Sequence, residues 1–321
     1  MPRPRKALIA VEETPYYHVI SRCVRRSFLC GMDSETGENY EHRRTWIEQR
    51  IRLLASLFAI DICAYAIMSN HLHIVVKLQP EQAKDWNTQD VLLRWTSLFK
   101  GTLLVQRYLA GSALSAAELD TVNSCVEVYR QRLTSLSWFM KCLNEPIARQ
   151  ANQEDGCTGH FWEARFKSQA LLTEEALLSC MAYVDLNPVR ANIAETPEGS
   201  DYTSIKERLT PTFNLAHAIA EQTRQGNIQH FSHALKPLLP FEGAQVEQLQ
   251  QGILFSLKDY LQLLDYTSRA IRPSQPGSTV NPLPPILQRI NLGQQDWLAR
   301  ATQFEARYNT HFSRRAHRDT A

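Results

Sequence analysis

The sequence lacks several features that would assign it to a specialised class of protein. No apolar run approaches the roughly 18–20 residues that a membrane span requires. The basic N-terminal stretch is not followed by the apolar core and small-residue cleavage site of a secretory signal. The seven cysteines are scattered and form no CxxC pair, which indicates reduced thiols and neither a disulfide framework nor a zinc site. We therefore expect a cytoplasmic protein with no membrane partner.

Charge is also nearly balanced, because the formal net charge is only +2 across 321 residues. The total therefore gives little support for a nucleic-acid partner, but the basic residues are clustered. Local clusters can follow a phosphate backbone whatever the total charge, although solvated surface charge is the alternative explanation for each of them. The clusters are Arg3, Arg5 and Lys6; Arg22, Arg25 and Arg26; Arg43, Arg44, Arg50 and Arg52; and Arg314, Arg315 and Arg318.

The hydrophobic pattern predicts an α+β fold. Aromatic and β-branched content predicts strands at 15–24, 61–68, 71–78 and 161–172, and helical spacing predicts helices at 39–60, 134–152 and 174–187. Ser69 and Asn70 suit a hairpin turn between the second and third strands. The order β-α-β-β-α-β is that of a ferredoxin-like split βαβ unit with an antiparallel sheet.

Two stretches fall outside this unit. Residues 79–131 are polar and partly helical, and they lie where the unit would tolerate an insertion. After about residue 210 the pattern weakens into amphipathic segments. We therefore expect one domain over 1–210 and a separate helical C-terminal region of unknown role over 211–321.

The most informative triplet is His71-Leu72-His73. On a strand, residues two apart point to the same face, so both imidazoles project together while Leu72 points to the core. Two imidazoles converging from one strand can form half of a metal site. Two surface or half-buried histidines are the simpler explanation of this triplet alone.

A second cluster lies in the last predicted helix. Tyr183 and Asn187 are four residues apart, so they lie one above the other on one helix face. Pro188 is expected to end this helix and so places Asn187 in its last turn. Taken alone, the segment is better explained by an ordinary capping Asn-Pro that follows a tyrosine packed in the core.

Together, the two clusters resemble the pattern of single-tyrosine HUH transposases. The resemblance is to the REP-associated tyrosine transposases, related to the insertion-sequence-200-like group, and it covers about residues 1–209. Five segments carry it in order, and the set is specific although each segment alone is weak. They are residues 1–6, 17–22, 68–76, 159–166 and 183–190.

The resemblance implies a site and a cofactor. It makes Tyr183 the nucleophile, His71 and His73 metal ligands, and Asn187 the third ligand. It also implies Mg²⁺ or Mn²⁺ as the metal. Imidazole ligands by themselves suit zinc, copper or iron better than magnesium, so this choice of metal comes from the resemblance alone.

The implied function is metal-dependent cleavage and rejoining of single-stranded DNA near hairpin-forming repeats, through a 5′-phosphotyrosine. Single-stranded or hairpin DNA would be the partner, a homodimer the assembly, and the nucleoid the location. The residues expected to hold DNA are Arg22, Arg25, Arg26, Arg43, Arg44, Arg165, Lys167 and Arg190. His18, on the first strand, is expected to be a packed histidine.

Two alternatives stay open. A replication-initiator-like nickase would use the same chemistry for another purpose, although relaxases typically carry a third histidine in the metal motif and a nucleophile near the N-terminus. A domesticated, sequence-specific DNA-binding protein would keep the fold without catalysis. Such a binder would need none of the four residues Tyr183, His71, His73 and Asn187, all of which are present.

Overall fold

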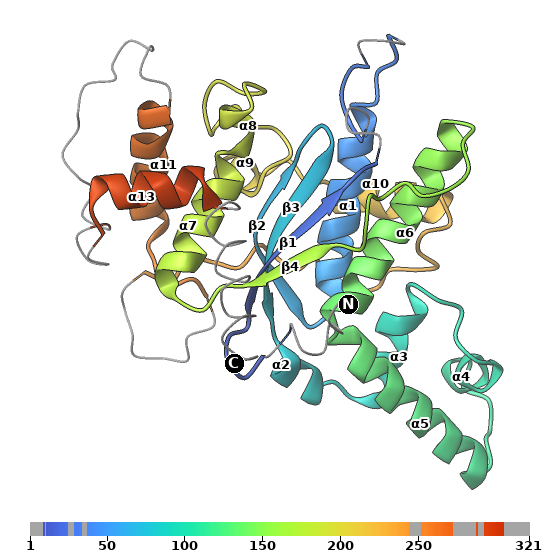
Figure 1. Cartoon of the computed structure of the whole chain (residues 1–321). Coiled ribbons are helices and arrows are strands. Elements are labelled where there is room, and N and C mark those ends of the chain that lie inside the picture. The colour runs from blue at the N-terminus through green and yellow to red at the C-terminus, as the bar shows by residue number, and fades with distance from the viewer. Residues whose placement is uncertain are drawn as a thin grey trace, which may run out of the picture.

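The computed structural model describes residues 9, 11–24, 29–33, 37–243, 252–271, 287 and 292–304, and a four-stranded sheet lies at its centre (Figure 1). The strands are β1 (Tyr16–Arg22), β2 (Ile60–Ile67), β3 (His71–Leu78) and β4 (Lys167–Ala170). They lie in the order β2-β3-β1-β4, and every neighbouring pair is antiparallel. The predicted α+β class with an antiparallel sheet is therefore confirmed.

The predicted hairpin is formed by β2 and β3. Its turn is Ser69-Asn70, and Met68 N donates to His71 O at 2.9 Å across it. On its other side β3 pairs with β1, with Ile20 opposite His73 and Arg22 opposite His71. The histidine strand is therefore a central strand of the sheet, held by hydrogen bonds along both edges.

The last strand is shorter than predicted. The sequence predicts a strand over 161–172, whereas only Lys167–Ala170 pairs with β1, and Trp162 forms an isolated bridge with Cys23. Phe161 and Phe166 are both buried in one core cluster. Residues five apart point to opposite faces of a regular strand, so the chain must bend between them to bury both rings.

Two long helices cover one face of the sheet. They are α1 (His42–Leu57) and α6 (Leu136–Glu154), which pack against each other (Figure 1). The β3 side chains that face them are Leu72, Ile74 and Val76, all of which are buried. This alternation leaves His71 and His73 on the opposite face of the sheet.

The predicted insertion is mostly helical. Trp95 and Tyr129 stack with ring centres 4.6 Å apart and join its second and fourth helices. The side chains of Asn87 and Ser115 begin these helices by accepting hydrogen bonds from the backbone three residues on. The helices are α2 (Pro80–Lys84), α3 (Thr88–Thr96), α4 (Leu103–Leu109) and α5 (Ala116–Leu133).

The opposite face of the sheet is covered by α7 (Glu174–Asp185), which contacts β2 and β3. Helix α7 ends at Asp185, so Asn187 does not lie in its last turn as predicted. Asn187 instead begins the short helix α8 (Asn187–Arg190), with Pro188 in its first turn. Proline is tolerated there because the first-turn N–H groups have no helical acceptor, so the chain turns into a new helix where the sequence predicted only an end.

Described residues after 210 pack on both sides of this unit. Helix α10 (Leu215–Arg224) contacts α1, and α13 (Gln294–Thr302) contacts α7 and α11 (Leu257–Ile271). A further short helix, α9 (Ser204–Leu209), contacts β2. Among the described helices, none is long and apolar enough to cross a membrane.

A buried carboxylate ties α7 to these later segments. Asp185 is fully buried, and its Oδ1 accepts hydrogen bonds from Ser204 Oγ and from Ile205 N. Its Oδ2 accepts a hydrogen bond from the hydroxyl of Tyr260, on α11, at 2.6 Å. Burial raises the pKa of the Asp185 carboxyl, and the three donors oppose that effect.

Candidate active site

The two histidines of β3 lie side by side on the sheet face that α7 covers. Their ring centres are 4.6 Å apart and their planes are nearly perpendicular. His73 is fully buried, and His71 at the hairpin end of the strand is half-buried. The strand alternation predicted this shared face.

A third imidazole, that of His18 on β1, lies beside them and is buried, as predicted for a packed histidine. His18 Nε2 lies 3.0 Å from His73 Nδ1, which is a hydrogen bond between two buried rings. Strand alternation places His18 on the same face as Arg22, but its contact with His73 depends on the pairing register of β1 with β3.

Burial keeps these imidazoles neutral. Loss of solvation, followed by the nearby charge of Arg22, lowers the pKa of His71 to about 4. Loss of solvation, followed by His71, lowers the pKa of His18 to about 3. The pKa of His73 is lowered well below its usual value, also chiefly by burial. Each ring therefore carries one proton at neutral pH and keeps one nitrogen lone pair.

Tyr183 packs against the cluster formed by His18, His71 and His73. Its ring packs edge-on against His73, with ring centres 5.6 Å apart, and against His18 at 6.3 Å. Helix α7 carries it and begins at Thr173, whose side chain accepts a hydrogen bond from Ala176 N. The tyrosine is 7% exposed. The helix thus brings the predicted nucleophile against a predicted ligand.

Asn187 and Arg190 follow in α8. The Arg190 Cζ atom lies 4.6 Å from the centre of the Tyr183 ring. Its charge is one of the influences that lower the pKa of His73. Within the part of the chain that the structure describes, Asn187 Nδ2 and Arg190 Nη1 are buried and have no hydrogen-bond partner. Buried polar atoms of this kind are expected where a ligand completes the bonding.

The two histidines of β3 could hold a metal ion only together with ligands from outside this strand. His71 Nδ1 donates to the side-chain oxygen of Asn70, and His73 Nδ1 bonds His18, so Nε2 is the nitrogen of each ring that would bind a metal. Across the described ranges, no three histidine, cysteine, aspartate or glutamate side chains are placed to hold a metal ion. A site here would need the Asn187 oxygen and the oxygens of a bound phosphate.

Phe304 covers the tyrosine. This residue follows α13 and is fully buried. Its ring centre lies 5.8 Å from that of Tyr183 and 5.5 Å from that of His18. No local pattern in the sequence connects Phe304 with Tyr183, so this contact could not be predicted.

The predicted DNA-binding residues fall into separate groups. Arg22 is exposed beside His71, and Arg165 and Lys167 are exposed at and just before the edge strand β4. Arg25 and Arg26 lie outside the described residues. The side chains of Arg22 and Arg190 therefore flank the histidines and the tyrosine, while Arg165 and Lys167 lie on the other side of β1.

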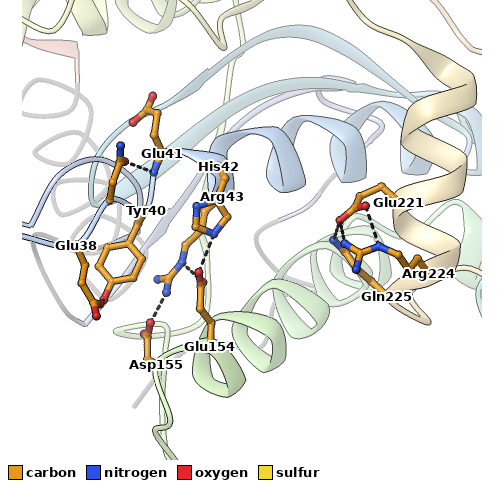
Figure 2. Close-up of polar contacts among 11 residues, drawn as sticks. Glu38, Tyr40, Glu41, His42, Arg43, Glu154, Asp155, Glu221, Arg224 and Gln225 are labelled. Carbon is orange, nitrogen blue, oxygen red and sulfur yellow. Dashed lines mark hydrogen bonds and ion pairs between the residues drawn. The ribbon is translucent and has the colours of Figure 1, made fainter.

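Arg43 and Arg44 are not available to DNA, which corrects the prediction. Arg43 is fully buried between the carboxylates of Glu154 and Asp155 (Figure 2). Arg44 is 5% exposed, pairs with Glu41 and donates to the backbone oxygen of Ile67. Both guanidinium groups are paired with acceptors inside the fold, because a buried guanidinium requires hydrogen-bond acceptors.

Comparison with known proteins gives one structural match. No protein-family model matches the sequence, and a search of curated proteins finds no match. A solved structure described as the REP-associated tyrosine transposase bound to a REP hairpin is similar with 10% identity and a TM-score of 0.33. The match covers 67% of this chain and 90% of that one. A likeness of this size assigns neither a family nor a function.

Proposed function

We propose that this chain is a metal-dependent endonuclease and transesterase that cleaves and rejoins single-stranded DNA near hairpin-forming repeats. The observation that carries the proposal is the contact of Tyr183 with His73, two residues more than 100 positions apart in the sequence. A phenol, three neutral imidazoles and an arginine without a full set of partners meet at one place. We further propose that the sheet with α1 and α6 is the ferredoxin-like unit of an HUH endonuclease.

In the proposed reaction Tyr183 Oη attacks a backbone phosphorus. The Oη–P bond forms as the bond from phosphorus to the 3′-oxygen breaks, the phenolic proton goes to solvent, and the 3′-oxygen takes up a proton. The products are a 5′-phosphotyrosine and a free 3′-OH. Because one phosphodiester replaces another, a 3′-OH can reverse the step and join strands without ATP.

The residues around Tyr183 have distinct roles in this proposal. Mg²⁺ or Mn²⁺ held by His71, His73 and Asn187 would withdraw charge from the phosphate oxygens. Arg190, stacked on the nucleophile's ring, would bind a phosphate oxygen, and Arg22 would hold the strand beside His71. Arg165 and Lys167 would contact DNA that passes the β4 edge.

A single-stranded substrate follows from the position of the nucleophile. Tyr183 is held on a helix against a sheet, so a phosphate must approach closely to reach it. Base pairing stiffens the backbone and hides the base edges, whereas an unpaired strand can be drawn in with its bases splayed and stacked. Location at the nucleoid and assembly as a homodimer are parts of the same proposal.

A cleavage assay tests the proposal. Oligonucleotides with a single strand flanking a hairpin are incubated with protein and Mg²⁺ or Mn²⁺, and covalent adduct is detected by denaturing gel and mass spectrometry. We expect adduct from the native chain and from Tyr202→Phe, but none from Tyr183→Phe, with DNA binding retained in all three. Adduct formation by Tyr183→Phe, or equal cleavage of a continuous duplex, would reject the proposal.

A second candidate is a DNA-binding protein that does not cleave. The observations that favour it are the packing of Phe304 on the Tyr183 ring and the burial of Tyr183, which is only 7% exposed. Tight binding of hairpin DNA with no adduct, even after removal of the Phe304 side chain, would select this function over the first.

A further inference from the structure

The hydrogen bond between His18 and His73 lies in the plane of both rings. The planes differ by 12°, and the ring centres are 5.2 Å apart while the bonded nitrogens are 3.0 Å apart. The two distances differ by about two ring radii, so both nitrogens lie close to the line between the ring centres. The rings therefore lie edge to edge and are not stacked, and the hydrogen bond follows the lone-pair direction.

Two neutral rings can form this bond in only two ways. Either His18 Nε2–H donates to His73 Nδ1, or His73 Nδ1–H donates to His18 Nε2. The first arrangement puts the remaining proton of His73 on Nε2, where it blocks metal binding. The second leaves a lone pair on His73 Nε2.

His71 provides a comparison within the same site. Its Nδ1 bonds the side-chain oxygen of Asn70, which can only accept, so His71 Nε2 carries a lone pair. A site that uses both histidines needs the same tautomer at His73. At His73, however, the partner is another imidazole, and the protonation of His18 decides the outcome.

We propose that His18 is a positioning residue that accepts a hydrogen bond from His73 Nδ1 and thereby holds His73 in the metal-binding tautomer and orientation. This inference rests on the proposed function. Ligating histidines usually donate to a carboxylate or a backbone carbonyl. An uncharged imidazole in that place adds no negative charge, so the two histidines alone bind metal weakly and depend on the phosphate of bound DNA.

The first test reads the tautomer directly, in the native chain and without metal. Long-range ¹H–¹⁵N correlation spectra near pH 7 distinguish protonated from unprotonated ring nitrogens. We expect His73 to be protonated on Nδ1 and His18 to be unprotonated on Nε2. The opposite tautomer at His73 would overturn the proposal, whatever the activity of the protein.

The second test measures Mn²⁺ affinity by electron paramagnetic resonance, with hairpin DNA present. His18→Phe removes the acceptor and should weaken binding about 10- to 100-fold, as is usual when such outer partners are lost. His18→Gln keeps an acceptor oxygen and should retain binding within a few-fold. The control is His230→Phe, because His230 bonds Thr96 of α3 outside the candidate site.

The outcomes separate this inference from the proposed function. Equal Mn²⁺ affinity of His18→Phe and the native chain overturns the role of His18 and leaves the metal site standing. Absence of Mn²⁺ binding to a native chain that shows the expected His73 tautomer overturns the metal site itself. If His18→Phe fails to fold, the tautomer spectrum and His18→Gln still decide the question.

Discussion

The ring of Phe304 lies 5.8 Å from the ring of Tyr183, tilted by 35°, and the same phenylalanine meets His18 edge-on. The phenylalanine follows α13, and the tyrosine lies in α7, the helix that α13 contacts. Arg300, in α13, also pairs with Glu175 at 3.3 Å. We therefore expect the C-terminal segment to limit the access of DNA to Tyr183, the proposed nucleophile.

Phe304→Ala should therefore expose Tyr183. We expect faster nitration of Tyr183 by tetranitromethane, measured by mass spectrometry of its peptide, and a loss of about 3–5 kcal/mol in the free energy of unfolding. Phe58→Ala is the matched control, because Phe58 is buried on the other face of the sheet. Its destabilisation should be similar without faster nitration of Tyr183, and equal nitration in both variants would contradict the cover.

Arg190 should matter to the reaction more than to the fold. Replacing it with methionine should slow adduct formation about 100-fold, the usual effect of removing one donor from a developing charge. Arg190→Lys should retain part of the rate because it keeps the charge without the planar guanidinium. The comparison is Arg165→Met at an exposed position. A rate for Arg190→Met within twofold of the native rate would exclude the role proposed for it.

Arg43 and Arg22 should give opposite results. Arg43→Met leaves Glu154 and Asp155 without their buried partner and should lower the free energy of unfolding by about 2–4 kcal/mol, measured by urea denaturation. The folded variant should bind DNA with an unchanged salt dependence. Arg22→Gln should leave stability within about 0.5 kcal/mol. It should reduce the salt slope of binding, followed by fluorescence anisotropy, by about one.

His233 provides a test of stability against pH outside the candidate site. It lines a cavity of about 260 Å³ with Trp86, Arg94 and Lys236. Burial, followed by the charge of Arg94, lowers its pKa to about 4. The unfolded chain takes up this proton near pH 6.5, so the neutral ring's contribution is complete above pH 6.5 and is lost as the pH falls towards 4.

An NMR titration of the His233 ring should therefore show a midpoint near pH 4. In thermal unfolding, His233→Gln should lose less stability between pH 7 and pH 4.5 than the native chain. A midpoint near 6.5, or identical pH profiles for the two proteins, would contradict the burial of this ring.

Local patterns predicted most of the sheet and part of the site. The alternation of β3 places His71 and His73 on one face as predicted, whereas the single helix expected to carry both Tyr183 and Asn187 ends between them, at Asp185. Each of these inferences uses neighbours along the chain. The position of α7 over the histidines then follows, because α7 packs on the face of the sheet that α1 and α6 leave uncovered.

The remaining contacts depend on partners that are distant in the sequence. His18 meets His73 through the register of β1 with β3, and Phe304 meets Tyr183 through the packing of α13. Arg43 resembles a surface cation in the sequence because its two acceptors lie more than 100 residues further on. Neither a strand register nor a distant carboxylate leaves a signal in the residues next to these positions.

The carboxylate of Asp185 has a consequence for how this chain can be shortened. A chain ending near residue 210 would keep Ser204 and Ile205 but would lose the hydroxyl of Tyr260. Loss of one hydrogen-bond donor to a buried charge lowers the free energy of unfolding by about 1–3 kcal/mol. The loss would occur at Asp185, two residues from Tyr183. The C-terminal third thus stabilises α7, the helix that carries Tyr183. A fragment without it would need a substitution such as Asp185→Leu to keep α7 in place.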